Sequence, residues 1–223
     1  MARRTKEEAA ITREQLLDAA ERVFRERGVA ASSLAEVASA AGVTRGAVYW
    51  HFRDKADLFA AMCERATLPL ETMLDSAGTT VHSDPLGALR ELALTALTRL
   101  ARDPRSQAVF EVMFHKCEGA GELASITERK QRERRRCLVQ VERVLQQAVR
   151  AGQLPADTDT TLATQALHAY IAGIMHEWVL DPGAYDLATA AAPLIDAMLA
   201  GLRAAPPRLP SRIEHKARVA REA

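Results

Sequence analysis

Residues 33–55 read SLAEVASAAGVTRGAVYWHFRDK, and this stretch decides the fold class of the chain. Ser33 and Glu36 form a capping box, which predicts the start of a short helix. Gly42 ends that helix because glycine adopts left-handed turn conformations without a steric penalty, and Thr44 caps the next helix. Two short helices joined by a tight turn are typical of a helix-turn-helix, whose second helix fits the major groove of DNA.

The second helix of this pair carries side chains suited to contact DNA. Arg45 is able to donate two hydrogen bonds to a guanine edge, and Gly46 lets the backbone approach closely. Lys55 stands at the start of a following helix, where its charge would neutralise a phosphate. The predicted DNA-binding residues are Ser33, Thr44, Arg45, Gly46, Tyr49, Trp50, His51 and Lys55. By spacing alone, a generic helical hairpin with solvated charges is an alternative.

The rest of the chain is predicted to be helical almost throughout, because apolar residues recur at three- and four-residue spacing and strand-type alternation is nearly absent. The pairs Asp84-Pro85 and Asp103-Pro104 each open a helix, since aspartate caps and proline loses no hydrogen bond at the first position. The later helices are predicted over 85–101, 104–117, 122–151 and 187–202, and from Asp157 or Thr158 to about Asp181.

These elements predict an all-α chain in two parts. Four short helices fill the first quarter and five longer helices follow, with the fourth helix as the connection. We expect a helix-turn-helix domain over 1–55 and a second helical domain over 56–205. Residues 206–223 hold three prolines and several charges, and we expect them to form a mobile tail.

Composition narrows the class of protein. The chain has 223 residues, of which 48% are hydrophobic, so it is able to bury a core. Its net charge of +1 confines any DNA-binding surface to a local patch. Three cysteines without paired spacing argue against a disulfide framework, and neither a signal peptide nor an apolar run of membrane length is expected. The sequence therefore predicts a cytoplasmic protein without membrane partners.

Residues 42–59, GVTRGAVYWHFRDKADLF, resemble the DNA-binding domain of the TetR family of bacterial repressors. Gly28 and the pattern Leu34-x-x-Val37-Ala38 upstream fit the same family. The motif Tyr49-Trp50-His51-Phe52 is similar to the AcrR-like and TtgR-like branch of the family, which regulates multidrug efflux pumps. The same branch is resembled by three later segments, DPLGALREL, HKCE and AVRAGQLP. The resemblance covers most of the chain, and its first quarter is the specific part.

The resemblance implies nine or ten helices, a homodimer built by the last two long helices, and a ligand-binding cavity in the C-terminal part. A hydrophobic effector, such as a drug, an antibiotic or a plant phenolic, would then release the repressor from a palindromic operator. By family position, the ligand-binding residues would be Leu92, Ala93, Ala96, Phe110, Phe114, Val141, Val144, Leu145, His168, Ala172 and His176. The dimer interface would contain Tyr170, Ile174, Trp178, Leu194, Met198 and Leu202. Ordinary core packing within one protomer is the alternative for both sets.

No sequence motif points to catalysis or to a cofactor, since the chain has no HExxH, P-loop or GxSxG pattern. His115 and Cys117 are too few for a zinc site, and redox sensing through Cys63, Cys117 or Cys137 is a minor alternative. Two other functions compete with a regulator. A helical small-molecule carrier would leave the recognition helix unexplained, and a constitutive architectural DNA-binding protein would leave the long helical remainder unexplained.

Overall fold

The computed structural model describes residues 6–117 and 124–208, and within these ranges the chain forms nine helices and no strand. In chain order they are α1 (Lys6–Arg27), α2 (Leu34–Ala40), α3 (Arg45–His51), α4 (Lys55–Thr79), α5 (Pro85–Arg102), α6 (Pro104–His115), α7 (Ala124–Arg150), α8 (Thr160–Leu180) and α9 (Leu187–Ala204). The all-α architecture predicted from the sequence is confirmed.

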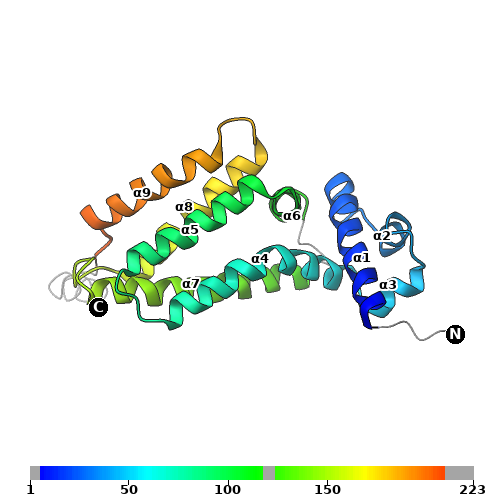
Figure 1. Ribbon diagram of the computed structural model, residues 1–223, viewed down its shortest axis with the longest axis horizontal. Coiled ribbons are helices and arrows are strands. Elements are labelled where there is room, and N and C mark those ends of the chain that lie inside the picture. The colour runs from blue at the N-terminus through cyan, green and yellow to red at the C-terminus, as the bar shows by residue number, and fades with distance from the viewer. Residues whose placement is uncertain (1–5, 118–123, 209–223) are drawn as a thin grey trace, which may run out of the picture.

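The helices are arranged in two parts along the long axis of the molecule (Figure 1). The first three, α1 to α3, gather at one end and are called the head below. α4 and α7 lie side by side along the axis, and α5 packs against α9 in the other part. α6 contacts α1 and α4 as well as α5 and α8, so this short helix lies where the two parts meet.

Most helices begin at the capping residues that the sequence indicates. The Ser33 hydroxyl accepts the backbone N–H of Glu36, and the Glu36 carboxylate accepts the backbone N–H of Ser33 at 2.8 Å, which completes the capping box. Side-chain oxygens of Thr44, Asp54, Asp84, Asp103 and Asp186 cap α3, α4, α5, α6 and α9 in the same way. These contacts satisfy backbone donors that the first turn of a helix leaves without partners.

The start of α8 differs from the prediction, because its cap is Asp159 and neither Asp157 nor Thr158. The Thr158 hydroxyl donates to the Pro155 carbonyl at 2.7 Å, and Asp157 forms an ion pair with Arg208. Both earlier candidates are therefore engaged elsewhere, and the side chain of Asp159 accepts the backbone N–H of Leu162 at 3.0 Å.

Two separate clusters of buried side chains hold the molecule together. The head core joins α1 to α3 with the first half of α4, and its largest members include Phe24, Leu17, Leu58 and Phe59. The C-terminal core joins α5, α7, α8 and α9 with the end of α4. α6 contributes Val109 and Val112 to the head core and Phe110 to the C-terminal core.

The fourth helix is much longer than predicted. α4 has 25 residues and runs through Pro69 to Thr79, so the prediction of a short fourth helix is wrong. Its upstream half packs in the head core through Leu58 and Met62, and Leu74 packs in the C-terminal core. Tertiary packing at both ends therefore continues a helix that a proline alone would be expected to break.

Part of the segment expected to be a tail is held against the fold. The Pro207 carbonyl accepts the backbone N–H of Asp159 at 2.8 Å, and Arg208 pairs with Asp157. Pro206 is buried. The remainder of the expected tail, 209–223, lies outside the described residues.

Among the described helices, α9 is long and apolar enough by length and composition to cross a membrane, with a mean hydropathy of 1.3 over 18 residues. Pro193 and Asp196, which interrupt the apolar run in the sequence, lie inside this helix without ending it. Asp196 forms a bidentate ion pair with Arg90 of α5, at 2.6 and 3.0 Å. The buried side of α9 packs in the C-terminal core through Ile195 and Leu199, as in a core helix.

Candidate functional site

The recognition helix predicted from the sequence is α3, and it has one buried side and one exposed side. Val48 is fully buried in the head core and anchors the helix. Tyr49 and Trp50, which follow directly, are 49% and 72% exposed. Adjacent exposed aromatic side chains form an apolar patch, and such patches mark contact sites more often than single exposed residues do. The exposed side of α3 is thus shaped for contact.

An open hollow of about 380 Å³ lies beside this helix, between the start of α2, the exposed side of α3 and the start of α4. It is lined by Ser32, Ser33, Leu34, Ala35, Arg45, Tyr49, Arg53, Asp54 and Lys55. Four of the eight residues predicted to bind DNA therefore surround one concave surface. Arg53 is not among the predicted DNA-binding residues, although it is strongly exposed. It adds a third positive charge to the rim of this hollow, beside Arg45 and Lys55.

Lys55 and Ser33 already have partners inside the head. The Lys55 ammonium donates to the backbone carbonyls of Ala30 and Ser32, each at 2.8 Å. The Ser33 hydroxyl serves the capping box, and its hydrogen bond lowers the pKa of the Glu36 carboxyl. These contacts fix the connection between α1 and α2. The predicted phosphate contacts of both residues stay predictions.

The turn between α2 and α3 depends on Gly42, whose φ of +67° is a left-handed conformation that disfavours other residues. A Cβ atom at Gly46 would meet only the Thr44 hydroxyl, at 3.9 Å, so the surface above Gly46 is open. The Trp50 ring packs edge-on against His51, which is half-buried. Thr44, Gly46 and Trp50 are all exposed, while His51 is half-buried.

The residues predicted to bind a ligand converge from α5, α6, α7 and α8. Ala93, Phe110, Val141, Val144 and Leu145 are buried in the C-terminal core, and Leu92 and Phe114 pack against it. Ala96, His168, Ala172 and His176 are half-buried. The two phenyl rings of Phe110 and Phe114 stack with their centroids 5.6 Å apart. The structure thus places seven of the eleven predicted residues in or against the C-terminal core, and the other four are half-buried on the same helices.

Two histidines supply polar groups at this region. The His168 Nδ1 atom lies 4.0 Å from the Cys137 sulfur, and burial lowers the pKa of His168, which keeps the imidazole neutral at physiological pH. The His176 ring lies 5.5 Å from Phe114 and 4.6 Å from His115, between ring centroids. The sequence suggests His115 only as a metal ligand, and in the structure its Nε2 atom is buried without a hydrogen-bond partner. No sequence pattern indicates this contact, because the two histidines are far apart in the chain.

Several residues predicted at the dimer interface hold α8 and α9 together within one protomer. The Tyr170 hydroxyl donates to the Leu194 carbonyl at 3.0 Å, and the Trp178 indole donates to the Tyr185 carbonyl at 3.1 Å. Trp178 and Leu202 are buried in the chain itself, and Ile174 and Met198 are half-buried against the C-terminal core.

The same two helices expose small residues that the sequence reading missed. On α8 and α9 these are Ala166, Ala169, Gly173, Ala197, Ala200 and Gly201. Small side chains let two helices approach closely, so this face suits contact with helices of a second protomer. Periodicity alone directs attention to the large apolar residues. Of these, Trp178 and Leu202 are buried in the protomer itself, and the interface role of the set stays a prediction.

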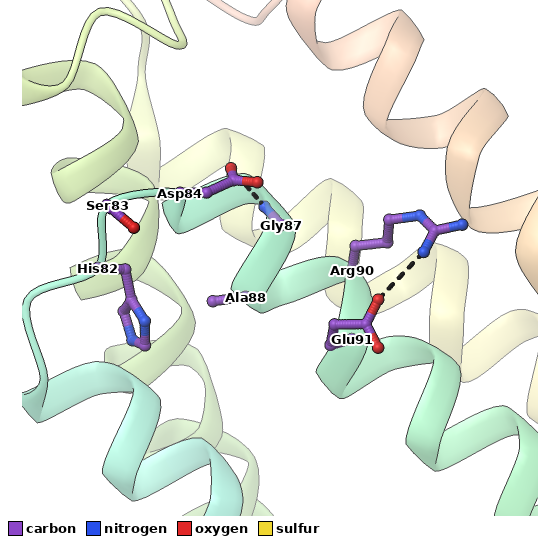
Figure 2. Close-up of a pocket in the computed structure, with 7 residues that line it drawn as sticks. All are labelled: His82, Ser83, Asp84, Gly87, Ala88, Arg90 and Glu91. Carbon is purple, nitrogen blue, oxygen red and sulfur yellow. Dashed lines mark hydrogen bonds and ion pairs between the residues drawn. The ribbon is translucent and has the colours of Figure 1, made fainter.

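A second open hollow, of about 480 Å³, lies at the start of α5 and is lined by His82, Ser83, Asp84, Gly87, Ala88, Arg90 and Glu91 (Figure 2). Asp84 accepts the backbone N–H of Gly87 at 2.9 Å, which is its role as helix cap. Arg90 binds Glu91 at 3.1 Å and also reaches Asp196. These polar groups are thus occupied in joining α5 to its surroundings, and none of them belongs to a predicted site.

Two of the three half-buried cysteines, Cys63 and Cys137, have the properties of structural thiols. Burial raises the pKa of Cys63 to about 12 and that of Cys137 to about 11. Because the thiolate is the reactive form, both side chains are poor nucleophiles at neutral pH. In the described ranges, no three His, Cys, Asp or Glu side chains come together as a metal site.

Comparison with known proteins agrees with this geometry. Residues 16–62 match the family described as "Bacterial regulatory proteins, tetR family", and residues 84–204 match "MAATS-type transcriptional repressor, C-terminal region". The HTH-type transcriptional regulator TtgR of Pseudomonas putida is 39% identical over 206 residues, which cover 92% of this chain and 98% of TtgR.

Two solved structures have the same architecture. NalD, the secondary repressor of the MexAB-OprM multidrug efflux pump in Pseudomonas aeruginosa, is 35% identical, with a TM-score of 0.79 over 88% of this chain and 98% of NalD. The complex of SmeT with triclosan is 35% identical, with a TM-score of 0.78 over 86% of this chain and 91% of SmeT, a repressor from Stenotrophomonas maltophilia. The helix-turn-helix match covers α2 and α3, and the repressor match covers the helices from α5 to α9. The chain therefore belongs to the TetR family of bacterial transcriptional regulators, with a C-terminal region of the MAATS repressor type.

Proposed function

We propose that the chain is a ligand-responsive repressor of a multidrug efflux operon that acts as a homodimer in the cytoplasm and catalyses no reaction. The observation that carries this proposal is the exposed side of α3, where Tyr49 and Trp50 stand out from a helix anchored by the buried Val48. The efflux assignment rests on the printed names of relatives, since NalD and SmeT are both described as repressors of multidrug efflux pumps.

Operator recognition would require two heads. A dimer with twofold symmetry presents two copies of α3, and a palindromic operator offers two matching half-sites about 34–36 Å apart, or a multiple of that distance. Arg45 would read a base, while the positive rim of the hollow beside α3 would bind phosphates through Arg53 and Lys55. Because the net charge of the chain is only +1, attraction to DNA would come from this local surface.

The effector would be a hydrophobic aromatic compound, whether a drug, an antibiotic or a plant phenolic. The stacked rings of Phe110 and Phe114 offer an aromatic surface, and His168 and His176 offer polar groups beside it. Binding sites of this kind are mostly apolar with a few polar groups that orient the ligand. The complex of SmeT with triclosan supports the same chemical class.

α6 provides the physical connection between effector and head. Phe110 and Phe114 face the C-terminal core, whereas Val109 and Val112 pack in the head core. The Lys116 carbonyl, directly after α6, accepts the backbone N–H of Val29 at 3.0 Å. An effector that displaces α6 must therefore shift the head, and by linkage it must then lower the affinity for an operator of fixed spacing.

The proposal is tested by selecting binding sites from random duplex DNA with the full-length protein. A repressor of this kind is expected to enrich one palindromic sequence, and sedimentation of the complex should give an even number of protomers. Enrichment of no sequence, or of a single unpaired half-site, would contradict the proposal.

A further inference from the structure

α4 is the helix that runs from the head into the C-terminal part, and it contains a proline in its interior. Pro69 has no N–H group, so the carbonyl of Arg65 receives no hydrogen bond from the position one turn later. The proline ring also crowds that carbonyl, and sharp bends in helices are concentrated at such positions. The backbone of α4 is therefore weakest near Pro69.

The same stretch of α4 contributes no residue to either core. No residue from 67 to 73 is buried, and Leu68 and Met73 are 51% and 42% exposed. The last buried residue upstream, Ala66, belongs to the head core, and the next one downstream, Leu74, belongs to the C-terminal core. The weak point of the backbone thus coincides with the gap between the two cores.

The upstream half of α4 is fastened to the head by ion pairs. The Arg65 guanidinium binds Glu14 at 2.8 Å and Asp18 at 2.9 Å, and it also binds Glu21. Arg65 and Glu21 keep only 14% and 11% of their side-chain surface exposed, so the ion pair between them is shielded from solvent. Residues 55–66 must therefore move together with α1.

The downstream half is fastened to α7 instead. Asp75 binds Arg136 and accepts a hydrogen bond from Gln140 at 3.0 Å. The upstream half also contacts α7, through the pair of Glu64 with Arg129 at 3.2 Å and through Phe59, whose ring centroid lies 5.9 Å from the Lys130 ammonium. Both side chains of the Glu64–Arg129 pair are well exposed, and exposed ion pairs of this kind constrain little.

We propose that Pro69 is the hinge of α4 and that this hinge determines the range of half-site spacings in operator DNA that the dimer is able to bind. The proposal rests on the proposed function, because spacing has meaning only for two heads on one DNA. A dimer whose protomers each have a flexible joint between the head and the C-terminal core places its two heads over a range of distances. An α4 without this joint would hold the two heads at one distance. Pro69 is then a specificity-determining residue that never touches DNA.

The hinge itself is tested by amide hydrogen exchange on the full-length protein without DNA. In the wild type, amides of residues 67–73 are expected to exchange about tenfold faster than those of residues 58–65, as for a segment that opens locally. Pro69→Ala restores the missing N–H and should remove this difference. Leu68→Ala, a matched change at the neighbouring exposed position, should leave it. Equal protection of both segments in the wild type would overturn the hinge.

The consequence for DNA is tested with the selected operator and with versions that carry one or two base pairs inserted at its centre. Each insertion separates the half-sites by about 3.4 Å and also rotates them. The wild type and Leu68→Ala should lose affinity gradually as base pairs are inserted. For the operator with one inserted base pair, the loss of affinity in Pro69→Ala should be at least about tenfold larger than in these two proteins. Equal losses in all three proteins would overturn the role in spacing. If the wild type binds none of these operator duplexes, both the proposed function and the role of Pro69 in spacing fail. The hydrogen-exchange experiment still decides whether Pro69 is a hinge.

Discussion

The guanidinium of Arg45 lies 5.6 Å from the centroid of the Tyr49 ring, one turn further along the exposed side of α3. The Tyr49 hydroxyl also accepts a hydrogen bond from this guanidinium at 3.4 Å. A cation held over an aromatic face gains a modest electrostatic stabilisation even at an exposed site. Arg45 is therefore oriented along the helix before it meets DNA, at the N-terminal end that enters the groove in helix-turn-helix proteins.

Arg45→Ala should reduce sequence discrimination while the protein stays folded and dimeric. A two-pronged arginine–guanine contact is worth about 1–3 kcal/mol, which corresponds to an affinity loss of about 5- to 150-fold for the operator. Fluorescence anisotropy with the operator and with a scrambled duplex measures the loss. Arg150→Ala, at the exposed end of α7, is the control. Unchanged operator affinity in Arg45→Ala would remove Arg45 from the interface.

Lys55→Met should weaken the binding of every duplex, whatever its sequence. If its ammonium contacts a phosphate in the complex, the slope of log affinity against log salt should fall by about one. Titration of the same duplexes at several salt concentrations gives this slope, with the exposed Lys116→Met as control. Weaker binding with an unchanged slope would show that Lys55 serves only to hold the carbonyls of Ala30 and Ser32.

Phe114→Ala should lower effector affinity and leave operator affinity without effector unchanged. The side chain stacks on Phe110 and touches His176, and an aromatic pair contributes about 0.5–1.5 kcal/mol beyond its buried area. We therefore expect binding of an aromatic effector, first identified by its release of the protein from the operator and then measured by calorimetry, to weaken by about three- to tenfold. The exposed Leu180→Ala is the matched control. The same affinity for this effector in both variants would exclude Phe114 from the effector site.

Ala169→Arg should convert the dimer into monomers without unfolding them. Ala169 is exposed on α8 in the protomer, so the new side chain disturbs only a second copy packed on that face. Loss of bivalent binding should reduce operator affinity by about a hundredfold or more. Sedimentation velocity and anisotropy report the two effects, and Gln146→Arg on the exposed side of α7 is the control. A dimer that survives Ala169→Arg would place the interface elsewhere.

Capping and turn residues in the sequence predict well where most helices of this fold begin. The capping box of Ser33, the Gly42 turn and the two Asp-Pro starts all occur as expected, because each depends on atoms only a few residues apart. The length of α4 is not predictable in this way. Its continuation through Pro69 depends on two cores formed by residues far away in the chain.

The candidate site was predictable only as a region. Spacing along α3 indicates which side chains lie near the DNA-facing end, but it does not reveal that Lys55 reaches back to the carbonyls of Ala30 and Ser32. Similarly, large apolar residues on α8 suggest a dimer interface, yet Trp178 is buried within its own protomer. In both cases the deciding contact crosses between elements, and a linear pattern contains no information about it.

The most direct test of the central claim is a gel-shift titration of the DNA upstream of the protein's own gene, with competitor DNA present. The titration is repeated with a panel of hydrophobic drugs and plant phenolics. The account predicts specific binding that at least one aromatic compound releases in a concentration-dependent way. Specific binding that no compound in the panel weakens would contradict the ligand-responsive part of the account. Absence of specific binding by an intact dimer, both here and to sequences selected from random DNA, would contradict the account as a whole.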